Sequence, residues 1–213
     1  MENNIIKLST DEADEIFPKK SGIDMSKLLL TTEGQYSVSK RRAAKKLQTI
    51  IFKYFKTNDI TVTDATSNNG SDTIMLAKYF KNVNAIELNK TNYTVLKNNI
   101  DVYGYTNINL INGDSTIELN STNQDVIYID APWGGRDYKK MKQLKLFLGR
   151  MELSDIYSKF KNRTKLFIFK VPYNYDINNF IIRTKVKNLR IRSYQQYDRI
   201  KFLFLIIKVK KIK

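Results

Sequence analysis

The sequence contains neither cysteine nor histidine. This absence excludes disulfides, thiolate nucleophiles, imidazole bases and the usual zinc ligands. No apolar run reaches the roughly 18 residues that span a bilayer, and the start, Met1 to Asn4, does not resemble a signal peptide. Any chemistry must use carboxylates, amides, hydroxyls, lysines or a cofactor. We expect an intracellular protein, cytoplasmic or nuclear, with no membrane and no metal partner.

Positive charge is in excess, with 37 Lys and Arg against 21 Asp and Glu, a net charge of +16. Such a field favours a polyanionic partner, and nucleic acid is the first candidate. The alternative is that AT-rich coding DNA, as in a large DNA virus or a parasite, enriches Lys, Asn and Ile; a viral protein would act in the host cytoplasm. Clustering favours binding, because the runs 40–46 and 139–145 flank segments that carry other functional signals.

A chain of 213 residues can bury one substantial core, so we expect a single main domain and a monomer. Residues 1–36 are polar, without sustained periodicity, and are interpreted as an N-terminal arm or lid. Residues 37–213 are predicted to form the domain, which opens with an amphipathic helix over 37–55.

Alternating strand and helix patterns follow this helix. We predict strands at 60–63, 84–87, 108–111, 125–130 and 165–171, with helices at 72–80 and 89–103, and a final antiparallel hairpin at 189–197 and 201–209. Strands separated by helices indicate a parallel sheet covered on both faces. A parallel sheet that ends in an antiparallel edge is typical of class I methyltransferases rather than dehydrogenases. The predicted fold class is α/β, a Rossmann-like, mostly parallel seven-stranded sheet with a C-terminal antiparallel hairpin and a short helical arm.

Polar residues stand at the ends of three successive predicted strands, where open α/β sheets bind ligands. The turn from Asp64 to Ser71 contains Gly70 and two asparagines, which tolerate positive φ and let backbone amides approach a ligand. Glu87 can accept both hydroxyls of a ribose, and Asp114 can accept from an adenine amine. Each alone has an ordinary alternative, namely a plain turn, a helix cap or a turn aspartate. Together they favour a nucleoside cofactor, and the glycine patterns of nicotinamide-binding enzymes and P-loop ATPases are both absent.

The fourth strand ends in Asp130-Ala131-Pro132-Trp133-Gly134-Gly135, which holds the only tryptophan. A carboxylate there can accept N–H bonds from an exocyclic nucleobase amine while the indole stacks on the base and fixes its plane. If a methyl group is transferred to such an amine, the amine loses its proton after or together with the arrival of the methyl group, so no strong base is needed. The structural alternative is a turn in which Pro132 stops the strand and Trp133 fills the core.

At this point the sequence resembles a known family. Residues 130–138, D-A-P-W-G-G-R-D-Y, are similar to the S-P-P-W-G-G-P-D-Y segment of trimethylguanosine synthases, which methylate guanine N2 in RNA caps. Residues 33–39 resemble its E-G-W-[FY]-S-V-T segment, 64–74 its cofactor turn, and 98–104 its N-N-x-x-V-Y-G helix end. The chain departs from the family at Asp130, which replaces a serine, and at Asn68 and Ser71, which replace glycines.

The resemblance implies S-adenosylmethionine as cofactor and capped RNA as substrate, with Trp133 stacking on the cationic 7-methylguanine. The implied catalytic residues are Asp130, Pro132 and Trp133. The implied cofactor-binding residues are Asp64, Ala65, Thr66, Asn68, Gly70, Thr73, Glu87, Asp114 and Asp130. The implied substrate-binding residues are Trp133, Ser37, Lys40, Arg41, Arg136 and Tyr138, of which the basic ones would meet the cap triphosphate.

Two alternatives stay open beside cap guanine-N2 methylation, and a third is disfavoured. The first is an amino methyltransferase that acts on adenine or guanine within RNA or DNA, because Asp130 brings the motif nearer to the D-P-P-Y type. The second is a catalytically silent cap- or RNA-binding module, for which the glycine-poor cofactor turn argues. A cap ribose methyltransferase is disfavoured, because its lysine-rich tetrad cannot be placed in the sequence.

Overall fold

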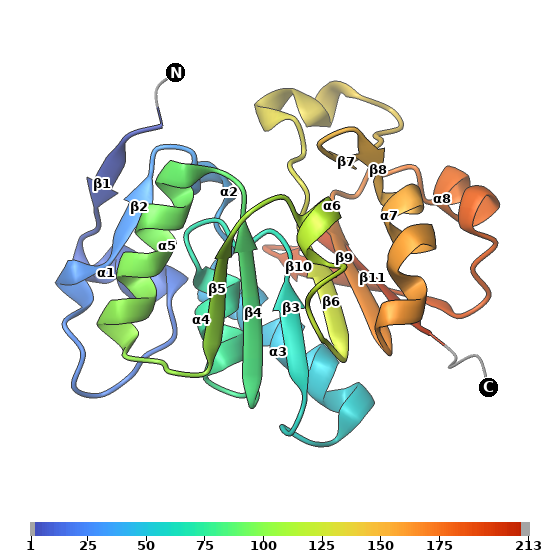
Figure 1. Cartoon of the computed structure of the whole chain (residues 1–213). Helices are drawn as coiled ribbons and strands as arrows, with labels where there is room; N and C mark the ends of the chain where they lie inside the picture. Colours follow the sequence, from blue (N-terminus) through green and yellow to red (C-terminus); the bar gives the residue numbers. More distant parts are fainter. Residues whose placement is uncertain (1–2, 210–213) are drawn as a thin grey trace. The chain divides into compact units, whose positions relative to one another are not determined.

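The computed structural model describes residues 3–209, which divide into two compact units at 114/115 (Figure 1). Unit 1 comprises residues up to Asp114, and unit 2 begins at Ser115. The sequence analysis did not predict this division. The boundary expected at residue 36 stays a prediction.

Unit 1 is built on three parallel strands, β3 (Thr61–Asp64), β4 (Asn82–Glu87) and β5 (Ile108–Asn112). Helices α4 (Ser71–Ala77) and α5 (Lys90–Tyr103) connect them. Helix α5 is capped at its start by Asn89, whose side chain accepts hydrogen bonds from two backbone amides of the first turn, and at its end by Gly104, whose φ is 61°. These caps explain why the strand β4 passes directly into a helix beside Glu87.

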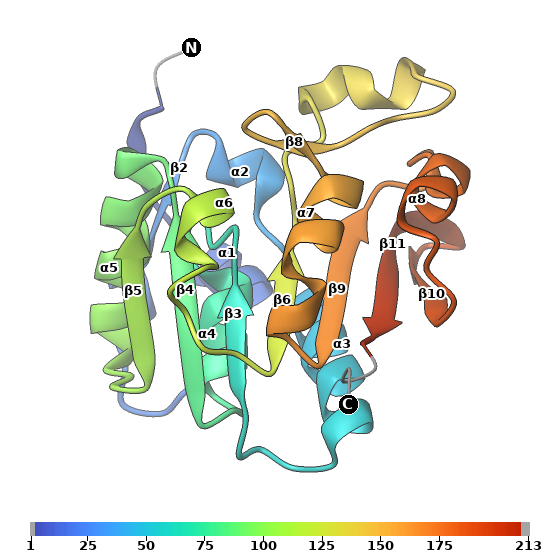
Figure 2. The ribbon, with the colours of Figure 1, turned by 45° about the vertical axis from the view of Figure 1, so that its right-hand side comes forward.

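The N-terminal segment is folded into unit 1. Strand β1 (Ile5–Lys7) pairs antiparallel with β2 (Leu29–Thr31), and α1 (Thr10–Ile16) and the 3-10 turn η1 (Met25–Lys27) lie between them in sequence. Buried side chains of this segment share one core cluster with α4, β4 and α5: Leu8, Ala13, Ile16, Phe17, Leu28 and Leu30. In Figures 1 and 2, β2 lies beside α5. The predicted arm is thus a packed layer of unit 1, with a strand pair that the sequence pattern did not indicate.

The amphipathic helix of the sequence analysis is α3 (Arg41–Phe55), preceded by the short α2 (Gly34–Ser37). It buries the apolar stripe that its period predicted, namely Ala43, Ala44, Leu47, Ile50 and Ile51. The helix starts at Arg41 rather than at residue 37, because the extended backbone of Lys40 forms its N-cap.

Unit 2 contributes four strands to the sheet: β6 (Val126–Ile129), β9 (Leu166–Val171), β10 (Leu189–Gln196) and β11 (Arg199–Lys208). β6 and β9 are parallel, β11 pairs antiparallel with β9, and β10 pairs antiparallel with β11. Helices α7 (Leu153–Phe160) and α8 (Ile177–Thr184) cover one face, where Tyr157 and Phe180 contact Phe167 and Phe169 (Figure 2). The remaining short elements are α6 (Ser115–Glu118), η2 (Gly135–Lys140), β7 (Phe147–Leu148), β8 (Met151–Glu152) and η3 (Lys161–Arg163).

The predicted fold class is confirmed. Within residues 3–209 the seven expected strands are all present, mostly parallel, and the last two form the antiparallel hairpin. The sequence analysis did not predict α7 or α8.

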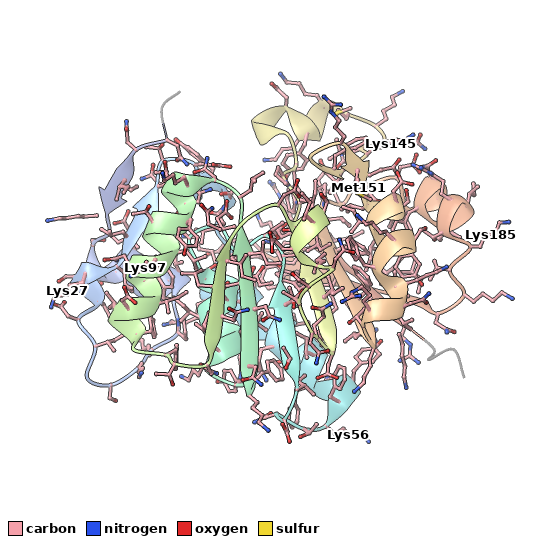
Figure 3. All side chains as sticks on the ribbon, in the orientation of Figure 1. Lys27, Lys56, Lys97, Lys145, Met151 and Lys185 are labelled. Carbon is pink, nitrogen blue, oxygen red and sulfur yellow. The ribbon has the colours of Figure 1, made fainter. Side chains whose placement is uncertain are left out.

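Basic side chains extend from both units. Figure 3 labels Lys27 and Lys97 on unit 1 and Lys145 and Lys185 on unit 2, and all four are exposed. Part of the +16 charge is therefore a general surface property. A basic residue on this surface therefore does not by itself mark a binding site.

Asn99 joins the N-terminal segment to α5, and its removal should destabilise unit 1. Its fully buried side-chain carboxamide accepts a hydrogen bond from the Leu29 N–H and donates one to the Leu29 carbonyl, both at 2.9 Å. We expect Asn99→Ala to lower the free energy of unfolding in urea by about 2 kcal/mol, because buried backbone groups would lose their partners. Lys97→Ala on the exposed face of the same helix should leave the free energy of unfolding nearly unchanged, because its ion pair with Asp101 is exposed to solvent. Equal losses in the two variants would contradict this role.

Candidate functional site

The first group of predicted residues lies in unit 1, where β3 ends. Asp64 is buried, and its carboxylate accepts a 2.7 Å hydrogen bond from the Thr73 hydroxyl and a 3.3 Å bond from the Thr66 amide. Thr73 and Ala65 are also buried. The structure thus brings Asp64 and Thr73 together, with Thr73 orienting the carboxylate from the first turn of α4.

The turn after Asp64 adopts two left-handed conformations, φ 49° at Asn68 and φ 96° at Gly70. A Cβ at Gly70 would lie 2.7 Å from the side chain of Leu96, so both the conformation and the space require glycine. Asparagine tolerates the left-handed region better than most residues, which accounts for Asn68 where the family has glycine. The departure at Asn68 is therefore compatible with the same backbone path.

Glu87 lies at the end of β4 and contacts this turn directly. One carboxylate oxygen accepts from the Asn68 amide at 2.7 Å, and the other accepts from the Asn89 amide at 2.8 Å. Burial raises the pKa of the Glu87 carboxyl, against the lowering effect of these two hydrogen bonds. Each oxygen has a second lone pair, so the oriented carboxylate can still accept from two ligand hydroxyls. Asp114, half-buried, follows the next strand at the same edge of the sheet.

A network of amides connects the turn to the N-terminal segment. The Asn69 side-chain oxygen accepts from the Thr31 amide at 2.8 Å, and the Asn99 side chain donates to the Asn69 carbonyl at 2.9 Å. A Cβ at Gly34 would lie 1.9 Å from this Asn69 oxygen, so the first residue of α2 must be glycine. The Asn68 side chain also donates to the Ser37 hydroxyl at 2.8 Å. Ser37, predicted to bind substrate, therefore lies against the predicted cofactor turn.

The predicted basic residues have mixed surroundings. Lys40 forms an exposed ion pair with Glu15 at 2.8 Å. The Nη1 atom of Arg41 is buried and has no hydrogen-bond partner among the residues described. Arg136 belongs to η2, and its side chain lies outside the described part of the chain. Binding of the cap triphosphate by these three residues stays a prediction.

In unit 2, Asp130 forms a buried ion pair that the sequence analysis missed. Its carboxylate lies 2.6 Å from the Lys170 ammonium, and the two side chains are 17% and 7% exposed. Lys170 comes from the end of β9, and the same ammonium lies 5.8 Å from the ring centroid of Trp133. A lysine within the otherwise apolar run 166–171 was the available signal, because a buried ammonium requires a carboxylate partner.

Trp133 lies in a loop shaped by two left-handed glycines, Gly134 with φ 86° and Gly135 with φ 72°. The edge of Tyr138 meets its ring at a centroid distance of 5.2 Å and an interplanar angle of 76°. Trp133 is half-buried, and its buried indole N–H has no partner among the described residues. Pro132 is exposed. The indole is thus held from one side and does not simply fill the core.

Residues 3–209 contain neither a membrane-spanning helix nor a cluster of metal-ligating side chains. The helices there are too short and too polar to cross a bilayer. The acidic side chains of these residues form no group of three or more that could hold a metal ion.

The fold and the donor groups define a class. Parallel strands whose carboxyl ends carry a turn aspartate, a buried glutamate and a further aspartate, followed by an antiparallel hairpin, define a class I methyltransferase that uses S-adenosylmethionine. The residues present fit this cofactor, since the oriented Glu87 carboxylate can still accept from two ligand hydroxyls, which is what a ribose presents.

Comparison with known proteins identifies the family within this class. A model of the RNA cap guanine-N2 methyltransferase family matches residues 60–210, so the chain belongs to that family. The family resemblance predicted from the sequence is confirmed. A curated relative, uncharacterized protein L320 of Acanthamoeba polyphaga mimivirus, is 29% identical over 91% of this chain and 84% of its own length.

Solved structures support the fold alone. Wild-type Trm5b from Pyrococcus abyssi matches with a TM-score of 0.54 at 16% identity, covering 90% of this chain and 55% of that one. An rRNA methylase from Streptococcus thermophilus matches with a TM-score of 0.52 at 15% identity, covering 72% of this chain and 89% of that one. The chain thus spans about half the length of the Trm5b structure.

Replacing Glu87 should weaken cofactor binding and remove its pH dependence. Calorimetry with S-adenosylhomocysteine should show at least a roughly tenfold loss of affinity for Glu87→Gln, because a carboxamide oxygen and nitrogen cannot both accept hydroxyl protons. Because ligand hydroxyls favour the ionised carboxylate while burial favours the protonated one, wild-type affinity should fall as the pH is lowered towards the raised pKa of Glu87. The same slope in Glu87→Gln would show that another group titrates.

Lys170 should be essential for the stability of unit 2. Lys170→Met leaves the Asp130 carboxylate without its ammonium partner, and we expect the free energy of unfolding in urea to fall by about 3 kcal/mol. Lys165→Met is the matched control, since it breaks the 2.6 Å pair of Lys165 with Asp125, in which the lysine is 52% exposed, and should cost less than about 1 kcal/mol. A loss below 1 kcal/mol for Lys170→Met would mean that the pair contributes little.

Proposed function

We propose that this methyltransferase transfers a methyl group to the exocyclic N2 of 7-methylguanosine in the 5′ cap of RNA. The family match supports the substrate. The observation that carries the proposal is Trp133, an indole braced by Tyr138 whose ring centroid lies 5.8 Å from the Lys170 ammonium that pairs with Asp130. A Trp face attracts a cation, and N7-methylation makes guanine cationic.

In this proposal unit 1 holds the cofactor. Glu87 accepts the ribose hydroxyls, the turn from Asp64 to Gly70 lies against the amino-acid part, and Asp114 accepts from the adenine amine. S-adenosylmethionine supplies an electrophilic methyl group on a sulfonium sulfur. Thr73, which is bonded to Asp64, keeps that carboxylate in place.

Unit 2 provides the acceptor residues. Asp130 accepts a hydrogen bond from the N–H of the exocyclic amine, which favours tetrahedral geometry at the nitrogen and reduces the conjugation of its lone pair with the ring. Trp133 fixes the plane of the base. The nitrogen releases one of its protons after or together with the gain of the methyl group. Because the proton need not be removed beforehand, a strong base is unnecessary. Lys170 orients the Asp130 carboxylate and balances its charge.

The rest of the cap is assigned by the same proposal. Lys40, Arg41 and Arg136 bind the triphosphate, and Ser37 and Tyr138 contribute to substrate binding. The viral relative supports a place of action in a host cytoplasm.

A second candidate, methylation of a neutral adenine or guanine within RNA or DNA, is favoured by one observation. The Lys170 ammonium already lies 5.8 Å from the Trp133 ring centroid, so a positively charged base would meet a cation close by. The ion pair with Asp130 offsets this repulsion because it leaves the pair without net charge. The two candidates therefore differ in whether the enzyme requires a cationic base.

Methyl transfer to two cap dinucleotides separates them. We expect wild-type enzyme to methylate a 7-methylguanosine cap analogue and to leave the unmethylated guanosine cap unmodified. Trp133→Ala should lower kcat/KM for the methylated cap by at least about tenfold, because the cation–π contact is lost, whereas Trp133→Phe should retain part of it.

Equal rates on the two caps would favour the second candidate. Absence of transfer to any substrate, together with absence of S-adenosylhomocysteine binding, would leave a cap- or RNA-binding module.

A further inference from the structure

The β10–β11 hairpin extends beyond the strand it pairs with. β11 pairs with β9 from Lys208 to Leu203, which is opposite Val171, whereas its pairing with β10 continues to Arg199, which is opposite Gln196. We call residues 194–202 the hairpin arm. The four residues of β11 that precede Leu203 span about 13 Å at about 3.3 Å per residue.

The hairpin arm leaves the sheet at the edge that carries the acceptor residues. β6 and β9 are parallel, and their carboxyl ends hold Asp130 and Lys170. Because β11 runs antiparallel to β9, its first residues lie at that same edge. The Lys170 ammonium lies 5.0 Å from the ring centroid of Phe202, and Tyr194 stacks on Phe202 at 4.7 Å and 9°. Aromatic rings thus connect Lys170 to the base of the arm.

The turn of the arm is built from residues that are poor for its conformation. Tyr197 and Asp198 have φ angles of 52° and 56°, and they are the two residues between the paired Gln196 and Arg199. Positive φ at both positions of a two-residue hairpin turn is the type I′ pattern, for which Asn-Gly is preferred. A tyrosine there is strained, and its side chain is 85% exposed. Stability alone does not explain an aromatic ring held in solvent on a strained backbone.

The charge around the turn is mostly positive. From Arg190 to Lys201 the hairpin carries four basic side chains, which are Arg190, Arg192, Arg199 and Lys201, and one acidic side chain, Asp198. The four are exposed and form no ion pair or hydrogen bond with another described residue. Charged residues also protect an edge strand such as β10 from pairing with other chains. That role accounts for the charges but not for Tyr197.

We propose that the hairpin arm binds the single-stranded RNA next to the nucleotide that is methylated. Tyr197 stacks on a base, and Arg199 and Lys201 contact backbone phosphates, as in other proteins that bind single strands through aromatic and basic side chains. β11 has a bulge at Lys201, which has no partner on β10 because the register shifts between Tyr194 and Gln195. The bulge leaves Lys201 outside the regular strand pairing. This inference rests on the proposed function, because it assigns a binding surface to the RNA that follows the cap.

The test compares a long and a short substrate. Tyr197→Asn keeps a residue that tolerates positive φ, so its melting temperature should equal or exceed that of wild type. Its affinity for a fluorescein-labelled capped ten-nucleotide RNA, measured by anisotropy, should fall roughly tenfold, because stacking on one base is lost. KM for methylation of that RNA should rise, with kcat and the kinetics on a cap dinucleotide unchanged. Arg199→Gln with Lys201→Gln should reduce the salt dependence of RNA binding.

Ile182→Asn is the matched control, because Ile182 is an apolar residue of unit 2 on α8 that is 73% exposed, and this variant should bind RNA as wild type does. Wild-type affinity in a folded Tyr197→Asn would overturn the inference, even if the cap were methylated. A tenfold loss of RNA binding in a chain that does not methylate caps would support the arm and overturn the proposed function alone.

Discussion

The Lys170 ammonium lies 2.6 Å from the Asp130 carboxylate, and the structure around the end of β6 and β9 in unit 2 depends on this pair. A lysine at the end of a buried strand is costly unless a carboxylate neutralises it. The family that the sequence resembles has serine at the position of Asp130, and a serine could not balance the ammonium. Asp130 is therefore explained by Lys170. The pair itself carries no net charge, so under the proposed function the Lys170 ammonium near Trp133 does not by itself exclude a cationic base.

The cofactor half follows a different rule, since a chain without histidine and cysteine must position ligands with amides and carboxylates. Glu87 is fixed by two backbone amides, and Asn69 is fixed by Thr31 and Asn99. These bonds fix the predicted cofactor turn relative to the N-terminal segment. Hydrogen bonds from asparagine side chains thus hold this turn in place although it contains a single glycine.

Local patterns were sufficient to predict much of the fold. Apolar runs predicted the strands of the sheet to within a few residues, and the positions of Asp64 and Glu87 at strand ends followed from the alternation of elements. Lys170 was missed because its partner is 40 residues away, and only the parallel pairing of β6 and β9 brings the two together. The strand pair β1–β2 was missed because each strand has three residues, too few to show a period. The hairpin was predicted, but its extension past β9 depends on register, which no local pattern reveals.

The position of the transferred methyl group tests the central claim most directly. Capped RNA would be incubated with the enzyme and S-adenosylmethionine, digested to nucleosides and analysed by mass spectrometry against standards. We expect 7-methylguanosine carrying one or two further methyl groups on N2. N6-methyladenosine, or a methyl group on a ribose oxygen, with unmodified 7-methylguanosine would contradict the proposed acceptor.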